Sequence, residues 1–210
     1  MTKFKLTQMT NDIEEHIDLD NSIKNAFLSL DREIFVPSGF RHLAYKLDAL
    51  PMEANQWISS PLTVAYITQH LELETKVDSI LEIGCGSGYQ AGILSYLSRR
   101  VFTIERIGSV LHTTKDRFRS LSLMNIISRF DDGQNGWIEN APYDRIVLSA
   151  TIDKVPDILF TQLIDDGILI APIKVGDKEF ITKYSKNNNI ITSHRMQECR
   201  FVPILDGREK

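Results

Sequence analysis

The fold of this chain is decided by the stretch Leu81-Glu82-Ile83-Gly84-Cys85-Gly86-Ser87-Gly88-Tyr89, which joins a short apolar run to a turn with three closely spaced glycines. The pattern is typical of a strand that ends in a tight turn and continues into a helix. Glycine accepts φ > 0 and lets a ligand approach the backbone. Such a turn at the carboxyl end of a strand therefore suits one end of a nucleotide-like ligand.

The spacing of the glycines narrows the kind of ligand. A dinucleotide fingerprint, G-x-G-x-x-G, needs glycine or alanine at position 89, where this chain has Tyr89. The acidic partner is nevertheless present, because Glu105 ends the next apolar run about twenty residues on, where a carboxylate accepts the hydroxyls of a ribose. A glycine turn and a ribose-binding Glu without the diphosphate spacing favour S-adenosylmethionine over a nicotinamide dinucleotide.

Composition bounds the class of protein. The chain has 210 residues, of which 42% are hydrophobic, so one substantial core in one domain is expected. Its net charge of −4 gives no general attraction to nucleic acid. Two cysteines, no long apolar run and a polar amino terminus predict a cytoplasmic protein with no membrane segment. We expect a monomer.

The order of patterns predicts an α/β architecture. Residues 10–32 have helical patterning, residues 38–60 predict a long ordered loop and residues 61–73 a helix. Strands are expected at 79–84, 100–105, 126–130, 144–149 and 167–173, and helices at 88–98, 108–121 and 155–164. This alternation predicts a doubly wound, mostly parallel sheet with helices on both faces. Combined with the glycine turn and Glu105, which favour S-adenosylmethionine, it is typical of a Rossmann-like class I S-adenosylmethionine-dependent methyltransferase fold.

The two ends of the chain differ from this alternation. Residues 180–192 predict an antiparallel hairpin and residues 199–205 a further strand. We therefore divide the chain into an N-terminal helical segment with its loop, 1–60, and a core with the C-terminal hairpin and strand, 61–210. The two parts are expected to form one compact domain.

Ligands of an open parallel sheet bind outside the carboxyl ends of its strands. Along the chain these ends carry Glu82 with the glycines, then Glu105, then Asp132-Gly133, then Ser149-Ala150-Thr151. Asp132 suits the adenine amino group, with Gly133 letting the backbone close on the ring. By itself Asp132 is more typical of a turn, but its place after the glycine turn and Glu105 favours the site.

The segment 55–61, which we call the Ser59 loop, carries the remaining candidate for the site. One hydroxyl of Ser59 and Ser60 is expected to cap the helix that begins near Pro61, which leaves the other free. Ser59 can then donate a hydrogen bond to a methyl acceptor and hold it in line. Methyl transfer from a sulfonium to an oxygen mainly needs orientation and a dry site, so no triad is required.

Other chemistries have little support. The five histidines are scattered, and neither C-x-x-C nor H-E-x-x-H occurs, so no metal site is predicted. Ser87 lies inside the glycine turn, which disfavours its use as a nucleophile.

Taken together, these segments resemble the protein-L-isoaspartate (D-aspartate) O-methyltransferase family over nearly the whole chain. The resemblance includes Phe35-Val36-Pro37, the Ser59 loop, the stretch from Leu81 to Gln90, Glu105-Arg106-Ile107, Asp132-Gly133 and the terminal Arg200-Phe201-Val202-Pro203. It implies methyl transfer from S-adenosylmethionine to the α-carboxyl of L-isoaspartyl residues in damaged proteins or peptides, with Ser59 as the catalytic residue. The implied cofactor contacts are Ile58, Ser59, Glu82, Gly84, Gly86, Gly88, Glu105, Arg106, Asp132 and Gly133. The implied substrate contacts are Trp57, Ser59, Arg200, Phe201, Val202 and Pro203.

Three positions depart from the family pattern. Asn55 replaces a Gly, Trp57 replaces a small residue, and Asp131 stands where a Gly usually precedes Asp132. An indole beside Ser59 can narrow the acceptor slot. Two alternatives therefore stay open: a catalytically impaired homologue that binds S-adenosylmethionine, and a methyltransferase with a different carboxylate or small-molecule acceptor.

Overall fold

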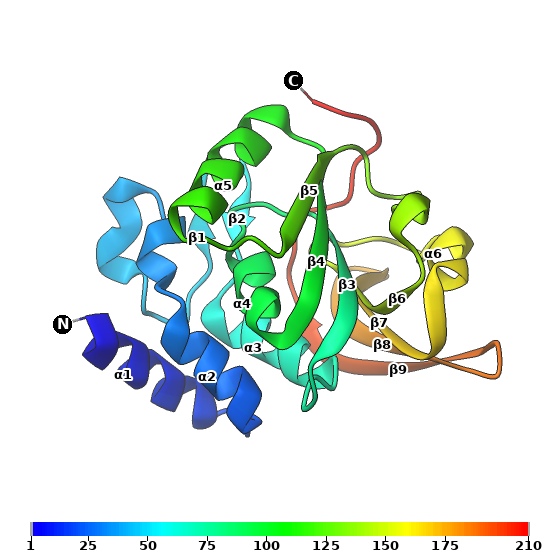
Figure 1. Ribbon diagram of the computed structural model, residues 1–210, viewed down its shortest axis with the longest axis horizontal. Helices are drawn as coiled ribbons and strands as arrows, with labels where there is room; N and C mark the ends of the chain where they lie inside the picture. Colours follow the sequence, from blue (N-terminus) through cyan, green and yellow to red (C-terminus); the bar gives the residue numbers. More distant parts are fainter. Residues whose placement is uncertain (1, 210) are drawn as a thin grey trace.

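A seven-stranded sheet forms the centre of the structure, a computed structural model that describes residues 2–209 (Figure 1). The strand order is β5-β4-β3-β6-β7-β8-β9. The strands are β3 (Val77–Ile83), β4 (Ser98–Glu105), β5 (Ile126–Phe130), β6 (Tyr143–Leu148), β7 (Leu163–Val175), β8 (Lys178–Asn187) and β9 (Ile190–Cys199). Strands β3 to β7 pair in parallel, whereas β8 and β9 pair antiparallel, so the predicted fold class is confirmed.

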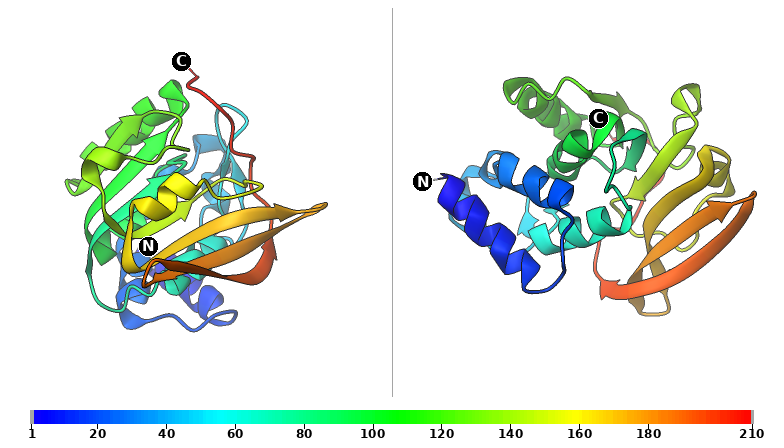
Figure 2. Two further views of the ribbon diagram at one scale, coloured as in Figure 1. Left: turned by 90° about the vertical axis from the view of Figure 1, so that its right-hand side faces the viewer. Right: turned by 60° about the horizontal axis from the view of Figure 1, so that its bottom comes forward.

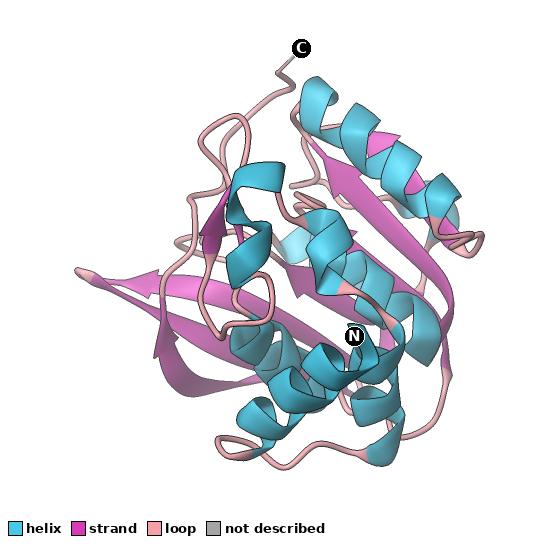
Figure 3. Ribbon diagram, turned by 90° about the vertical axis from the view of Figure 1, so that its left-hand side faces the viewer, coloured by secondary structure: helices cyan, strands magenta, loops and turns pink. Residues whose placement is uncertain are grey.

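Alternation along the strands directs side chains to two separate cores. Ile80 and Val101 face one cluster, which is covered by helices, while their neighbours Leu81 and Phe102 face the other. The helices on the first face are α1 (Thr2–Glu14), α2 (Asn21–Ser29), α3 (Pro61–His70), α4 (Tyr89–Leu97) and α5 (Gly108–Ser120). Figure 3 shows these helices lying over the sheet. The second face is covered by α6 (Asp157–Thr161) and the 3-10 turn η3 (Ile138–Asn140).

The amino-terminal region corrects the prediction of one helical stretch over 10–32. It forms two helices, α1 and α2, separated by residues 15–20, and the first begins at Thr2. The spacing of the apolar residues indicates this break, because Ile17 and Ile23 are six residues apart and cannot lie on one face of a single helix. Asp20 ends the connection, where its carboxylate accepts a hydrogen bond from Gln69 Nε2 at 2.7 Å.

The predicted long loop contains short ordered pieces. Two 3-10 turns, η1 (Arg32–Phe35) and η2 (Ser38–Leu43), precede a small antiparallel hairpin of β1 (Leu50–Pro51) and β2 (Trp57–Ile58). Helix α3 then begins at Pro61 as predicted. Ser60 is its cap, because its hydroxyl accepts a hydrogen bond from Thr63 N at 3.0 Å.

The carboxyl terminus corrects a second prediction, because residues 199–205 do not form a further strand. Strand β9 continues to Cys199 and pairs along β8, and the chain then crosses the carboxyl ends of the parallel strands (Figure 2). We call residues 200–209 the C-terminal strap. It is fixed by single bridges such as Thr151 with Pro203 rather than by a ladder. The predicted helix over 155–164 is also shorter, since β7 already begins at Leu163.

Candidate functional site

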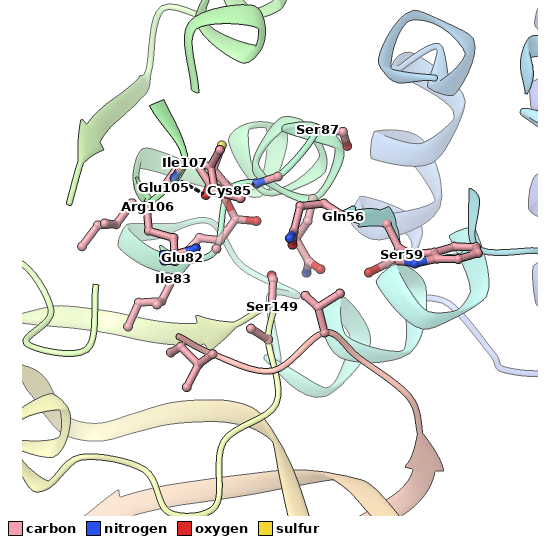
Figure 4. Close-up of a pocket in the computed structure, with 18 of the residues that line it drawn as sticks. Gln56, Ser59, Glu82, Ile83, Cys85, Ser87, Glu105, Arg106, Ile107 and Ser149 are labelled. Carbon is pink, nitrogen blue, oxygen red and sulfur yellow. Dashed lines mark hydrogen bonds between the residues drawn. The ribbon is translucent and has the colours of Figure 1, made fainter. Parts of the chain in front are cut away.

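A cavity lies outside the carboxyl end of β3, where the strand order turns from β4 on one side to β6 on the other. The space between its walls, with the open mouth included, is about 860 Å³. In Figure 4, Glu82, Cys85 and Glu105 form one side, Gln56 and Ser59 lie on the opposite side and Ser149 lies below. This is the topological switch point at which ligands of doubly wound sheets bind.

The glycine turn has the left-handed backbone that its sequence predicted. Gly84, Gly86 and Gly88 have φ values of 94°, 52° and 86°. Gly84 and Gly86 line the cavity, whereas Gly88 is absent from its wall. A Cβ on Gly88 would lie 2.6 Å from Thr114 Cγ2 and 2.7 Å from a Phe118 ring carbon, so this glycine lets α5 pack against the turn.

Glu105 ends β4 beside the turn. One of its carboxylate oxygens accepts a hydrogen bond from Gly86 N at 2.8 Å, and the other accepts from Ile107 N at 2.9 Å. Burial raises the pKa of Glu105, and these N–H groups offset part of the shift. Each oxygen keeps a second lone pair, so the carboxylate can still accept ribose hydroxyls.

Asp132 lies at the cavity wall and anchors the strap. Its Oδ2 accepts a hydrogen bond from Gly207 N at 2.6 Å, and its Oδ1 accepts from Gln134 N at 3.2 Å. Partial burial alone would raise the pKa of Asp132, but these two N–H groups outweigh it and the pKa is lowered. Gly133 is outside the wall, and a Cβ there would lie 2.8 Å from Ile83 Cγ2.

Four polar atoms of wall residues are buried without a hydrogen-bond partner among residues 2–209: Glu82 Oε1, Tyr89 Oη, Gln90 Nε2 and Ser149 Oγ. Buried polar groups are normally paired, so these atoms indicate that a polar ligand completes the site. Burial raises the pKa of Glu82 to about 8, although Thr103 Oγ1 donates a hydrogen bond to its other oxygen at 2.5 Å. The wall therefore offers a polar ligand the free Glu82 oxygen together with neutral donors such as Gln90 Nε2 and Ser149 Oγ.

The Ser59 loop forms the mouth of the cavity. Ala54 and Asn55 have φ values of 56° and 53°, and Asn is the side chain other than Gly that best tolerates this conformation. This explains how Asn55 can replace a Gly. Because Ser60 caps α3, the Ser59 hydroxyl is left free at the wall. Trp57 also lines the cavity and is 56% exposed, so its indole lies at the mouth rather than inside.

The structure brings most of the predicted residues together. The cavity is lined by Trp57, Ile58, Ser59, Glu82, Gly84, Gly86, Glu105, Arg106, Asp132, Val202 and Pro203. Four predicted residues are not in its wall, namely Gly88, Gly133, Arg200 and Phe201. Ser149, expected at the end of the fourth parallel strand, also lines the cavity, whereas sequence reasoning missed Gln56 and Gln90 as polar wall residues. Gln90 looked like an ordinary helix residue.

The histidines do not approach one another as ligands. Among residues 2–209 there is no group of three or more His, Cys, Asp or Glu side chains that could hold a metal ion. Within the same range, the helices are too short or too polar to cross a membrane.

A parallel sheet with a glycine turn at its switch point, followed by Glu105 and Asp132 at the next two strand ends, defines a class I S-adenosylmethionine-dependent methyltransferase. The orphaned polar atoms of the wall fit the amino-acid end of that cofactor, and Glu105 fits its ribose. Residues 4–209 match the model of the protein-L-isoaspartate(D-aspartate) O-methyltransferase family. The chain belongs to this family.

Individual relatives agree with that assignment. A protein-L-isoaspartate O-methyltransferase of Helicobacter pylori (strain G27) is 46% identical over 208 residues, which are 99% of each chain. A solved protein-L-isoaspartate O-methyltransferase superposes with a TM-score of 0.86 at 25% identity and covers 97% of this chain and 67% of its own. A Plasmodium falciparum PCMT solved with S-adenosyl-L-homocysteine shares the fold, with a TM-score of 0.82 at 20% identity, covering 97% of this chain and 98% of its own. The predictions of the family, its enzyme class and S-adenosylmethionine as cofactor are confirmed.

Proposed function

We propose that this chain transfers the methyl group of S-adenosylmethionine to the α-carboxylate of L-isoaspartyl residues in damaged proteins and peptides. The methyl ester then collapses to a succinimide, and hydrolysis partly restores ordinary aspartate. The observation that supports this proposal is a single cavity lined by the glycine turn with Glu105 and Asp132, by Ser59 and by the strap. Cofactor and acceptor residues therefore meet in one place.

The acceptor needs orientation more than activation. When bound, S-adenosylmethionine supplies an electrophilic methyl group on its sulfonium. The acceptor carboxylate has a pKa near 4, so it is already ionised at neutral pH and needs no general base. The free hydroxyl of Ser59 donates a hydrogen bond to one carboxylate oxygen and aims the other along the line of displacement.

The remaining predicted contacts are assigned by position. We assign the cofactor to Ile58, Ser59, Glu82, Gly84, Gly86, Glu105, Arg106 and Asp132, while Gly88 and Gly133 shape the backbone behind them. Val202 and Pro203 give the peptide an apolar wall, and Arg200 and Phe201 lie farther out on the strap. Trp57 contacts the peptide beside the isoaspartyl residue and helps to exclude water.

The test compares matched peptides that differ only in one linkage. We expect labelled methyl transfer to an isoaspartyl peptide and none to its aspartyl counterpart. Ser59→Ala should lower kcat on the order of 10²-fold, because it removes a positioned donor, while the Kd of S-adenosylhomocysteine changes little. Equal labelling of both peptides, or of neither, would overturn the proposal.

We further propose that the enzyme acts as a cytoplasmic monomer and needs no nucleic acid. Its net charge of −4 supports this, because it gives no general attraction to phosphate. In this arrangement residues 1–60 supply Trp57 and Ser59, whereas residues 61–210 supply the glycine turn, Glu105, Asp132 and the strap.

A further inference from the structure

Arg32 is a fully buried arginine on η1, and it lies outside the cavity wall. Among residues 2–209, no carboxylate is within ion-pair distance of its guanidinium. Burial lowers its pKa, with Tyr89 and Asp48 opposing the shift. A buried charge is costly unless hydrogen bonds compensate it, so the partners of this side chain show what it is there to hold.

Those partners are three backbone carbonyls from one loop. Arg32 Nη1 donates to Ala44 O at 2.6 Å, and Nη2 donates to Asp48 O at 3.2 Å and to Ser59 O at 3.0 Å. Ala44 follows η2, Asp48 precedes β1 and Ser59 follows β2. One planar group therefore fixes three points of the segment 44–59, including the backbone of the proposed catalytic serine.

The same guanidinium also contacts the cofactor side of the site. Its central carbon lies 5.5 Å from the ring centroid of Tyr89. Tyr89 is the first residue of α4, directly after the glycine turn, and it lines the cavity. Arg32 thus lies between the Ser59 loop and the glycine turn and touches both.

We propose that Arg32 is a positioning residue, which holds the Ser59 loop at a fixed place over the cofactor turn through its three carbonyl bonds and its stacking on Tyr89. The proposal rests on the proposed function. It concerns the acceptor step, because the glycine turn is held separately by Thr114 Oγ1, which donates to Gly86 O at 2.7 Å.

Arg145 on β6 provides a matched control. It also donates to three backbone carbonyls, Leu71 O at 2.5 Å, Asp144 O at 2.9 Å and Glu72 O at 3.2 Å. These carbonyls lie at the end of α3 and at the start of β6, and Arg145 is absent from the cavity wall. Its replacement removes the same number of bonds of the same kind without touching the Ser59 loop.

The experiment compares Arg32→Lys and Arg32→Met with Arg145→Lys and Arg145→Met in the full chain. We expect the Arg32 variants to lose at least tenfold in kcat/KM for the isoaspartyl peptide, Arg32→Lys less than Arg32→Met, while the Kd of S-adenosylhomocysteine changes less than threefold. The Arg145 variants should keep kcat/KM within threefold. Trypsin cleavage after Arg41 and Lys46 should become at least fivefold faster only when Arg32 is replaced.

Several results decide the proposal. Folded Arg32 variants with wild-type kcat/KM, or with parallel losses of peptide turnover and S-adenosylhomocysteine binding, would overturn it. If neither Arg32 variant folds, Asp31→Ala decides, because Asp31 Oδ1 holds η1 and the loop by accepting hydrogen bonds from Glu33 N at 3.0 Å and from Tyr45 Oη at 2.6 Å while Arg32 stays intact. A two- to fivefold loss of kcat/KM supports the proposal, and full activity overturns it.

A wild type that methylates neither peptide removes the proposed function and this proposal together, whereas an active wild type with active variants removes this proposal alone.

Discussion

Glu82 shows how burial sets the charge of the site. One carboxylate oxygen accepts from Thr103, and the other has no partner among the described residues. Burial raises its pKa to about 8. An unfolded Glu titrates near pH 4.3, so its proton stabilises the folded state fully below that pH, and this contribution is lost as the pH rises through about 8.

Glu82→Gln removes that titration and keeps an oxygen that accepts from Thr103. We expect the variant to match the wild type near pH 4 and to be more stable by about 2–4 kcal/mol at pH 9. Urea unfolding at pH 4, 7 and 9 measures the difference. Parallel stability profiles for the two proteins across this range would contradict the assignment.

Gly86 and Gly88 separate backbone strain from packing. Both have positive φ, but a Cβ on Gly86 meets nothing within 4 Å, whereas a Cβ on Gly88 meets Thr114 and Phe118 at less than 3 Å. Gly86→Ala should lower the free energy of unfolding by about 1–2 kcal/mol through strain alone. Gly88→Ala should lower it by about 3–5 kcal/mol, since overpacking is added. Equal losses in denaturant titrations would show that α5 moves away at little cost.

At the scale of elements, the sequence predicted the parallel part of the sheet well. Strand β5 lies at the predicted residues 126–130, because turn residues bound this short run on both sides, even though the strand is at the edge of the sheet and only partly buried. The errors fall where tertiary contacts decide. Residues 199–205 carry a strand-like pattern, but β9 is lengthened to match β8, so the chain beyond it becomes the strap.

The candidate site likewise contains residues that the sequence predicted and residues that it did not. Gly84, Glu105 and Asp132 were predictable because their spacing follows from the order of strands. Gln90 and Arg32 could not be predicted, because no local sequence pattern marks their roles. Gln90 has an unpaired buried amide nitrogen, and Arg32 donates hydrogen bonds to carbonyls that lie 12 to 27 residues away in the sequence.

The strap should be tested through its anchor. Glu179 Oε2 accepts from Phe201 N at 2.7 Å and from Thr151 Oγ1 at 2.8 Å, and Val202 and Pro203 beyond it line the cavity. Glu179→Ala should raise the KM for an isoaspartyl peptide about five- to tenfold, as expected when the loss of both bonds removes about 1–1.4 kcal/mol in total.

Asp165→Ala is the control for Glu179→Ala. Asp165 likewise accepts two hydrogen bonds, here from the backbone N–H groups of Asn188 and Asn189, each at 3.0 Å, but in the turn between β8 and β9. The Asp165→Ala variant should leave the KM for the isoaspartyl peptide unchanged. If both variants raised the KM equally, a general loosening of β8 would replace the local explanation.

At the scale of the whole molecule, the amino-terminal helices share a core with the sheet. Met9 on α1 and Phe27 on α2 belong to the same buried cluster as Ile80 of β3 and Ile181 of β8. Residues 1–60 therefore form a distinct part by position, but their apolar side chains have no separate core among the described residues. This favours one cooperative unit, as the predicted single compact domain requires.

Met9→Ala tests that cooperativity. Met9 is fully buried, so the change should lower the free energy of unfolding by about 2–4 kcal/mol. Phe4→Ala on the same helix should change it by less than about 0.5 kcal/mol, because Phe4 is 74% exposed.

Circular dichroism reports all helices, and fluorescence reports Trp57 in the loop and Trp137 at the second face of the sheet. If the core is shared, both signals move together to a lower urea midpoint in Met9→Ala, since damage at α1 weakens every layer. A separate early transition in circular dichroism alone would show that residues 1–60 unfold by themselves and that the Ser59 loop is only loosely joined to the glycine turn.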